Sequence, residues 1–289
     1  MKSHLFFGKR ALFLVAFVLL MTMVGCAGGT ETSATATEIP ATIAPQPTET
    51  ETTLTAFAAA SLTDAFGEIG AAFEAAHPGT TVVFNFAGSN QLATQIVEGA
   101  PADVFASANG TQMDVAVESG RIDGDAPQIF VTNRLIVIVP ADNPAGIETL
   151  QDLAQPDTLI VLAAEEVPVG RYSLEFLDKA AADPAFTEGY KEAVLGNVVS
   201  YEENVRSVLN KVALGEADAG IVYTSDLVGV EGVSQLDIPD ALNVVAKYPI
   251  AALNDSVNGE MAAAFVSYVL SEEGQSVLSN YGFGLAPTQ

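Results

Sequence analysis

The chain has 289 residues, of which 49% are hydrophobic and 16% charged, so most of it can fold around a buried core. Its formal net charge is −25 at pH 7, from 36 acidic and 11 basic residues. A chain this acidic, without a basic patch, repels a phosphate backbone, and we therefore expect no nucleic-acid partner.

The first 25 residues have the pattern of a targeting peptide. Lys2, Lys9 and Arg10 form a basic start, and an almost wholly apolar run follows over residues 11–24. The run is short for a membrane span, which needs ~20 residues, and suits the core of a signal segment. Removal of residues 1–25 takes away three of the 11 basic residues and none of the 36 acidic ones, so the net charge becomes −28.

A cysteine follows this segment. Met23-Val24-Gly25-Cys26 resembles a bacterial lipobox, where small or apolar residues fit a peptidase and the thiol then carries a diacylglycerol. The alternative is ordinary signal cleavage with Cys26 incidental. Cys26 is the only cysteine, so no internal disulfide is possible. We expect export, with the chain lipid-anchored through Cys26 to the outer face of the cytoplasmic membrane.

Residues 26–53 have the composition of a flexible linker. They are rich in Thr, Ala, Glu and Pro and have almost no large apolar side chain. Such a segment cannot bury enough surface to fold. The remaining residues, 54–289, are enough for one large domain or for two lobes.

Residues 54–120 alternate short β-branched runs with helical patterns. The expected elements are strands at 54–58, 81–86 and 102–106 and helices at 62–76, 91–98 and 111–119. In the first helix Leu62, Phe66, Ile69 and Phe73 recur at helical spacing. This alternation predicts parallel strands joined by crossover helices.

A second α/β set follows. Its expected elements are strands at 135–140, 159–163, 219–223 and within 242–252, and helices at 170–182, 205–214 and 259–278. We predict an α/β fold of two lobes, each a mainly parallel sheet flanked by helices. Lobe 1 comprises residues 54–134 and 247–289, and lobe 2 comprises 135–246. Because ligands bind at the carboxyl ends of such strands, we expect the ligand in the cleft between the lobes.

The chemistry of most enzymes is missing. Beyond the targeting peptide the chain has one histidine, His77, at a predicted helix end before a proline, and we expect it on the surface. A Ser-His-Asp, Cys-His or soft-metal site therefore lacks its residues. No G-x-S-x-G elbow, Walker A loop or G-x-G-x-x-G motif occurs. We expect no enzyme and no cofactor, and a hydrolase built on two carboxylates is the alternative.

Five predicted element junctions offer hydrogen-bond donors. They are at Ser61, Ser89, Val169, Val205 and Tyr223. A helix N-terminus has about four unpaired N–H groups and a partial positive charge, so it can hold an anion without a basic side chain. Serine and tyrosine hydroxyls add donors. Surroundings made only of donors suit a fully deprotonated oxyanion, whereas a partly protonated phosphate gains from an acceptor.

Each junction also has an ordinary explanation. Serines at helix starts usually only cap the helix, and we predict that Ser61 is such an N-cap. Val205 has a free N–H if Asn204 caps its helix and none if Ser200 does, because Ser200-Tyr201-Glu202-Glu203 also reads as a capping box. We predict Asn204. The spacing alone does not bring the five junctions together.

The motifs at these junctions resemble those of the periplasmic molybdate-binding proteins of molybdate ABC transporters. The likeness covers nearly all of residues 54–289, through FAAASLTDAF at 57–66, FAGSNQLATQI at 86–96, GAPADVFASA at 99–108, VPVGRYS at 167–173, ENVRSVL at 203–209 and GIVYTSD at 220–226. The resemblance implies a two-lobed type II periplasmic-binding-protein fold. It also implies that Ser61, Ser89, Val169, Val205 and Tyr223 bind molybdate through hydroxyl and backbone N–H donors.

Two positions depart from the family pattern. Gly88 stands where relatives can carry serine, which removes one possible donor, and Asn204 replaces an acidic residue. The resemblance implies a monomeric receptor that delivers molybdate to a membrane permease, with molybdenum present only as the bound oxyanion. Tungstate has nearly the same size and charge and is an equal alternative; sulfate and iron fit the junctions less well.

Overall fold

The computed structural model describes residues 51–286. The predicted signal segment, Cys26 and residues 27–50 of the linker lie outside the described residues. Within residues 51–286, no helix is long and apolar enough to cross a membrane.

The described residues alternate strands and helices, as predicted. The first elements are β1 (Thr52–Ala59), the 3₁₀ turn η1 (Ala60–Leu62), α1 (Thr63–Ala76), β2 (Thr80–Ala87), α2 (Ser89–Val97), β3 (Val104–Ala106), α3 (Gly110–Glu118) and β4 (Gln128–Pro140). The middle elements are η2 (Leu150–Ala154), β5 (Ile160–Ala163), α4 (Pro168–Ala182), α5 (Tyr190–Gly196), β6 (Val198–Glu202), α6 (Val205–Ala213) and β7 (Ala219–Tyr223). The last are η3 (Thr224–Leu227), β8 (Val233–Asp237), β9 (Val245–Ala252), α7 (Gly259–Leu270), α8 (Glu272–Asn280) and β10 (Gly284–Leu285).

The main path of the sheet has the strand order β2-β1-β3-β9-β4-β7-β5-β6. At one end β1 runs parallel to β2 and β3, and at the other β5 runs parallel to β6 and β7. The two long strands β4 and β9 join these sets and pair antiparallel with their neighbours. The α/β fold is therefore confirmed, with parallel strands at both ends and an antiparallel connection between them.

Strand β4 serves both ends of the sheet. It pairs with β9 over residues 128–134 and with β7 from Leu135 onward. It begins seven residues before the strand that we predicted at 135–140, because Thr132, Asn133 and Arg134 interrupt the apolar pattern. We call β1–β3 with α1–α3, α7 and α8 lobe 1, and β5–β7 with α4–α6 lobe 2. The residue bounds predicted for the lobes stay a prediction.

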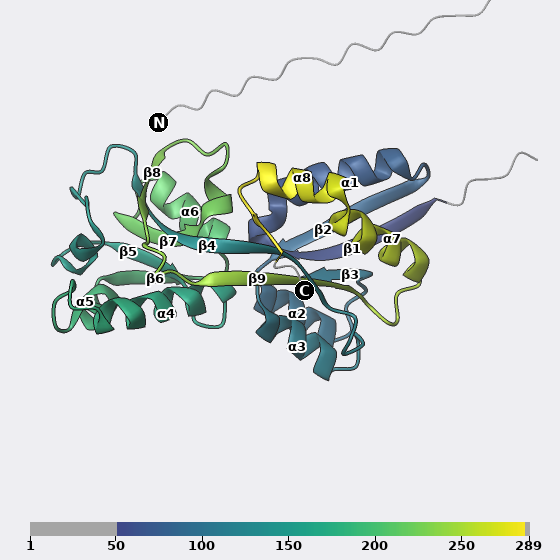
Figure 1. Cartoon of the computed structure of the whole chain (residues 1–289), viewed down its shortest axis with the longest axis horizontal. Coiled ribbons are helices and arrows are strands. Elements are labelled where there is room, and N and C mark those ends of the chain that lie inside the picture. The colour runs from purple at the N-terminus through teal and green to yellow at the C-terminus, as the bar shows by residue number, and fades with distance from the viewer. Residues whose placement is uncertain (1–50, 287–289) are drawn as a thin grey trace, which may run out of the picture. The chain divides into compact units, whose positions relative to one another are not determined.

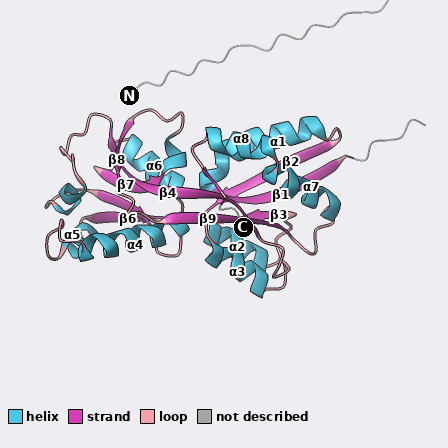
Figure 2. Cartoon of the chain, viewed as in Figure 1, coloured by secondary structure: helices cyan, strands magenta, loops and turns pink. Residues whose placement is uncertain are grey.

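Helices cover both faces of the sheet (Figures 1 and 2). In lobe 1, α1, α7 and α8 lie on one face and α2 and α3 on the other; in lobe 2, α6 lies opposite α4 and α5. Aromatic rings form much of the lobe 1 core: Phe66 contacts Phe84, Phe130 and Phe265 with ring centroids 5.9–6.1 Å apart. These layers bring the loops at the strand ends of both lobes together.

The predicted final helix at 259–278 is wrong in one respect. Helix α7 ends at Leu270 and α8 begins at Glu272. Ser271 between them has an extended backbone (φ −70°, ψ 168°), and its side chain accepts a hydrogen bond from the N–H of Gly274. The serine thus stops one helix and caps the next.

Candidate functional site

A small cavity lies where the loops of the two lobes meet. Its walls come from the ends of β1 and β2, the second residue after β3, the first turns of α4 and α6, and the end of β7. The lining residues are Ala59, Ala60, Ser61, Ala87, Gly88, Ser89, Ala108, Val167, Pro168, Val169, Asn204, Val205 and Tyr223. The cavity volume is only about 10 Å³, so it has no room for a sugar or a peptide.

The structure brings all five sequence-predicted residues to this one cavity. Each is at least 96% buried: the exposed fractions are 3% for Ser61, 1% for Ser89, 1% for Val169, 4% for Val205 and 1% for Tyr223. Three of them come from lobe 2 and two from lobe 1. Residues up to 162 positions apart in sequence therefore line one enclosed space, which spacing alone did not establish.

Ser61 does not cap a helix, so that prediction is wrong. It lies inside the turn η1, and α1 begins at Thr63 with Leu62 as its N-cap residue and no side-chain cap. The Thr63 hydroxyl closes the turn by donating to the carbonyl of Ala60 (2.7 Å). The Ser61 hydroxyl instead lines the cavity and lies 2.9 Å from the phenol oxygen of Tyr248.

Ser89 is the first residue of α2, which begins two residues before the predicted start. The N-cap position belongs to Gly88. The Ser89 hydroxyl oxygen accepts a hydrogen bond from the backbone N–H of Ala108 (3.0 Å). Because a backbone N–H can only donate, the proton of the Ser89 hydroxyl stays free for another acceptor.

Two helices of lobe 2 begin at the cavity. In α4 the first N–H bonded within the helix is that of Arg171, to the carbonyl of Val167 (3.0 Å), which leaves the N–H of Val169 without an intrahelical partner. In α6 the cap is Asn204, whose side chain accepts from the N–H of Ser207 (3.0 Å). The prediction that Asn204 caps this helix is confirmed. Val205 is the first residue of α6, so its backbone N–H has no partner within the helix.

Ser200, the other capping candidate, lies in β6 and is engaged elsewhere. Its hydroxyl donates to the carboxylate of Glu202 (2.7 Å) and accepts from the ammonium of Lys211 (3.0 Å). The residues that resemble a capping box therefore belong to a strand, in which Glu202 forms an ion pair with Lys211.

Tyr223 ends β7 with its phenol buried. Its hydroxyl has no hydrogen-bond partner within residues 51–286. Burial, with a smaller effect of neighbouring Tyr248, raises the pKa of the Tyr223 phenol well above its usual range. The phenol is therefore neutral, and its proton can be donated to a ligand in the cavity.

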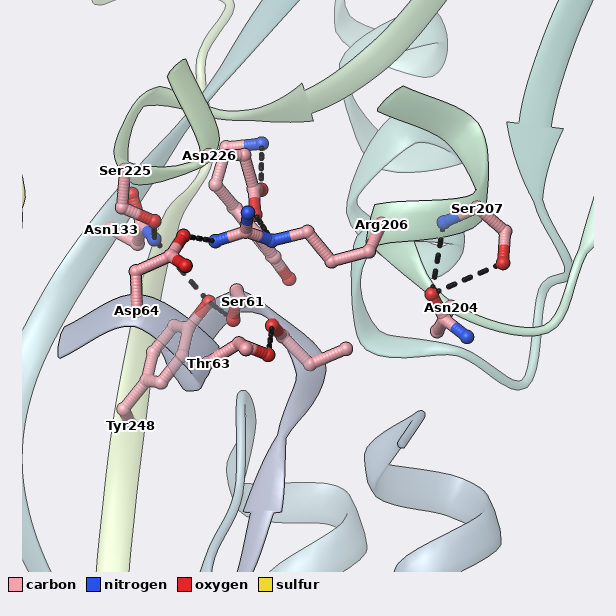
Figure 3. A network of polar contacts seen from close by, with 12 residues as sticks. Ser61, Thr63, Asp64, Asn133, Asn204, Arg206, Ser207, Ser225, Asp226 and Tyr248 are labelled. Carbon is pink, nitrogen blue, oxygen red and sulfur yellow. Dashed lines mark hydrogen bonds and ion pairs between the residues drawn. The ribbon is translucent and has the colours of Figure 1, made fainter. Parts of the chain in front are cut away.

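Among residues 51–286, no charged side chain lines the cavity. The guanidinium of Arg206, next to Val205, is paired with Asp226 of its own lobe (3.0 Å) and with Asp64 of lobe 1 (2.7 Å) (Figure 3). A bound anion would thus meet hydroxyl and peptide dipoles. Such dipoles attract negative charge at short range whatever the net charge of the chain.

Several contacts join the lobes around the cavity. Gln91 donates to the carboxylate of Glu203 (3.1 Å), and Arg171 donates to the hydroxyl of Thr111 (3.1 Å). The two backbones also approach closely at Gly88, where a β-carbon would lie 2.4 Å from the carbonyl oxygen of Glu203. Because glycine has no side chain, Gly88 provides no hydroxyl donor but lets the two lobes come into contact.

The residues behind the cavity wall could not be identified from the sequence motifs. Tyr248 and Asn133 stand behind Ser61, and Asp226 holds Arg206. Tyr248 and Asn133 lie in strands far from the cavity motifs in sequence, so no local pattern marks them. Asp226 ends the GIVYTSD motif, but the motif does not show that it pairs with Arg206. Within residues 51–286, no cluster of three or more His, Cys, Asp or Glu side chains could hold a metal ion. His77 is half-buried and stacks on Phe73 with ring centroids 4.0 Å apart.

Asp226 should make the stability of the chain depend on pH. Burial raises the pKa of this carboxyl to about 6, against a partial lowering by Arg206. Because the pKa is higher in the folded state, the folded chain binds the proton more tightly, and its free energy of unfolding should rise as the pH falls from about 6 to about 4.

Asp226→Asn should remove this contribution. Relative to the variant, the unchanged chain should gain about 1 to 3 kcal/mol between pH 7 and pH 4, measured by urea unfolding. Asp240→Asn, at an exposed acid paired with Arg134, is the matched control and should leave the profile unchanged. Parallel profiles for the chain and Asp226→Asn would contradict the assignment.

Comparison with known proteins agrees with this architecture. A family model described as bacterial extracellular solute-binding protein matches residues 54–284. The molybdate-binding protein ModA of Mycobacterium tuberculosis is 37% identical over 271 residues, covering 93% of this chain and 95% of that protein. The Escherichia coli protein of the same name is 34% identical, covering 80% and 88%.

A solved structure shows the same fold. The periplasmic molybdate-binding protein of Azotobacter vinelandii superposes with a TM-score of 0.70 at 18% identity, covering 81% of this chain and all of that one. The sequence and the fold thus agree on one group of proteins. The chain belongs to the bacterial extracellular solute-binding protein family, whose members are binding proteins rather than enzymes.

Proposed function

We propose that this chain captures molybdate, or the nearly identical tungstate, outside the cytoplasm and delivers it to the permease of an ABC transporter. The observation that carries the proposal is the cavity: two serine hydroxyls, a phenol and two helix N-termini line it, with no charged side chain among them. Relatives named as molybdate-binding proteins, at 37% and 34% identity, support the same ligand.

The donors suit an anion without protons. Ser61, Ser89 and Tyr223 can donate, and the free N–H groups at Val169 and Val205 can only donate. Molybdate, tungstate and sulfate are fully deprotonated at neutral pH, whereas phosphate keeps a proton that needs an acceptor. The protein named as the sulfate-binding protein of Escherichia coli is 25% identical over 67% of this chain, so sulfate is the natural competitor.

Calorimetry tests the proposal directly. Chain from residue 27 onward should bind molybdate and tungstate one to one at pH 7, sulfate more weakly, and phosphate not at all. Phosphate binding as strong as molybdate binding would contradict the donor-only account. Absence of both heat and thermal shift with all four anions would overturn the proposed function.

Tyr223→Phe should separate stability from binding. The phenol oxygen is buried without a partner within the described chain, so its removal should leave the melting temperature of the free protein unchanged or higher. The same change should weaken molybdate binding by roughly 1.5 to 3 kcal/mol, because a hydrogen bond to a charged ligand is lost. Calorimetry measures the affinity and thermal unfolding measures the melting temperature, both on one preparation. Unchanged affinity would exclude Tyr223 as a donor.

We further propose that Cys26 carries a lipid and that the mature chain acts as a monomer. The Bacillus subtilis protein YvgL, named as a candidate substrate-binding lipoprotein of an ABC transporter, is 28% identical over 96% of this chain. Cys26→Ala should move the protein from the membrane fraction to the soluble exported fraction. Membrane association that survives this change would contradict lipidation at Cys26.

A further inference from the structure

The Ser61 hydroxyl has one partner among the described residues, and it comes from the other end of the chain. The phenol of Tyr248, in β9, lies 2.9 Å from the Ser61 oxygen (Figure 3). Tyr248 is fully buried and Ser61 is 3% exposed. Two hydroxyls can share a hydrogen bond in either direction, so the direction must come from the groups around them.

Asn133 supplies that direction. Its side-chain oxygen accepts from the backbone N–H of Arg134 (2.9 Å) and from the Thr224 hydroxyl (3.1 Å). The backbone N–H is an obligate donor, so the amide cannot be turned the other way round. Its nitrogen therefore faces the hydroxyl of Ser225 (2.8 Å) and, over a longer contact, that of Tyr248 (3.4 Å).

The protons follow from this arrangement. An amide nitrogen can only donate, so the Tyr248 oxygen accepts from Asn133. Burial raises the pKa of the Tyr248 phenol well above its usual range, and the phenol keeps its single proton. That proton is then available for the Ser61 oxygen. When the Tyr248 phenol donates to the Ser61 oxygen, Ser61 has its own proton left for the cavity that it lines.

Ser89 is arranged in the same way by a different donor. Its oxygen accepts from the backbone N–H of Ala108 (3.0 Å), so its proton is also left for the cavity. With Tyr248 as the donor to Ser61, both serines receive a hydrogen bond from the protein and have one to give. At Ser89 the donor is a peptide group; at Ser61 it is a side chain, which mutation can remove.

We propose that Tyr248, held by Asn133, is a positioning residue that sets the Ser61 hydroxyl as a donor to the bound anion. The inference rests on the proposed function, because it specifies how one residue of that site is kept in its donating state. It also assigns a role in selectivity: a Ser61 oxygen already occupied by Tyr248 is poorly placed to accept a proton from a ligand such as hydrogen phosphate.

Tyr248→Phe is the test. Phenylalanine keeps the ring that packs against Phe130, Tyr223 and Phe283, with centroids 5.7–6.3 Å away, and removes only the hydroxyl. The dissociation constant for molybdate should rise about tenfold, because the Ser61 hydroxyl is no longer held as a donor. In the Ser61→Ala background the same change should alter the dissociation constant by less than about twofold, because both changes remove one function.

Tyr190→Phe is the matched control. Tyr190 is another buried tyrosine, and its hydroxyl donates to the carbonyl of Leu150 (2.6 Å) in lobe 2. Its loss should lower the melting temperature and leave the molybdate dissociation constant unchanged. If Tyr248→Phe does not fold, Asn133→Leu replaces it: this change is close in size, removes the donor nitrogen without adding a charge near the anion, and should weaken binding only when Ser61 is present.

The outcomes distinguish failure of the positioning role of Tyr248 from failure of the proposed function. A wild-type chain that binds molybdate, together with a Tyr248→Phe variant of equal affinity, overturns the positioning role and leaves the proposed function standing. An equal loss with and without Ser61 also overturns it, since the effect would then be structural. A wild-type chain that binds none of the oxyanions overturns the proposed function and the inference together.

Discussion

Changing Ser61 and Ser89 together to alanine is expected to weaken molybdate binding by roughly 3 to 6 kcal/mol, taking ~1.5 to 3 kcal/mol for each hydrogen bond to a charged group. Both hydroxyls lie in the cavity wall, at least 97% buried; the Ser89 oxygen accepts a hydrogen bond from a backbone N–H, and the Ser61 hydroxyl shares one with Tyr248. An oxyanion between them would have no water to replace the lost donors. Isothermal titration of the double variant and of each single variant measures the effect.

The serine substitutions need a control for the loss of a hydroxyl as such. Ser267→Ala removes a hydroxyl that donates to the carbonyl of Ala263 on the exposed side of α7. It should leave molybdate affinity unchanged. A double variant at Ser61 and Ser89 that binds molybdate within threefold of the unchanged chain would exclude the two hydroxyls as ligand donors.

Gly170→Ala, which adds a single methyl group, should destabilise lobe 2 strongly. A β-carbon at Gly170 would lie 2.0 Å from the carbonyl oxygen of Ala164 and 2.5 Å from that of Ala163. Both contacts are with backbone just after and at the end of β5, so no side chain can move aside. We expect a loss of about 3 kcal/mol in the free energy of unfolding, at the upper end of the usual cost of overpacking.

The same change should also weaken binding. Gly170 follows Val169 in the first turn of α4, and the turn must move away from β5 to make room for the methyl group. The N–H of Val169 would move with it. Urea unfolding and calorimetry on the variant check both effects. Gly67→Ala, in the exposed middle of α1 with no atom within 4 Å of the new carbon, is the control and should gain up to about 1 kcal/mol.

If Gly170→Ala unfolds at the same urea concentration as the unchanged chain, α4 does not pack as closely against the end of β5 as described. If it is destabilised but binds molybdate with unchanged affinity, the first turn of α4 does not contribute a donor. These two results address the packing and the site separately.

Much of the site could be predicted because its donors sit at element boundaries. Helix starts carry local signals: Pro168 at the first position of α4 and the Asn204 cap of α6 are both visible in the sequence. The motif resemblance then joined junctions that spacing alone left apart. What it could not supply is the direction of each hydrogen bond, which depends on strands that pair far away in the chain.

Ser61 and Tyr248 illustrate this limit. Ser61 precedes a helical pattern and so resembled a cap, but the turn at Ala60–Leu62 places its hydroxyl against Tyr248, 187 residues later. That contact exists only because β9 pairs with β3 and β4 in the middle of the sheet. Ser271 shows the opposite case: its capping role is local, and it opens the polar stretch at residues 271–276 that separates the apolar residues of α7 from those of α8.

A crystal structure of the chain with molybdate tests the central claim most directly, since the anomalous signal locates molybdenum without ambiguity. The account predicts one molybdenum atom in the cavity between the lobes. Its oxygens should lie about 2.6–3.2 Å from the hydroxyls of Ser61, Ser89 and Tyr223 and from the backbone nitrogens of Val169 and Val205. Molybdenum bound outside this cavity, or held by a lysine or arginine side chain, would contradict it.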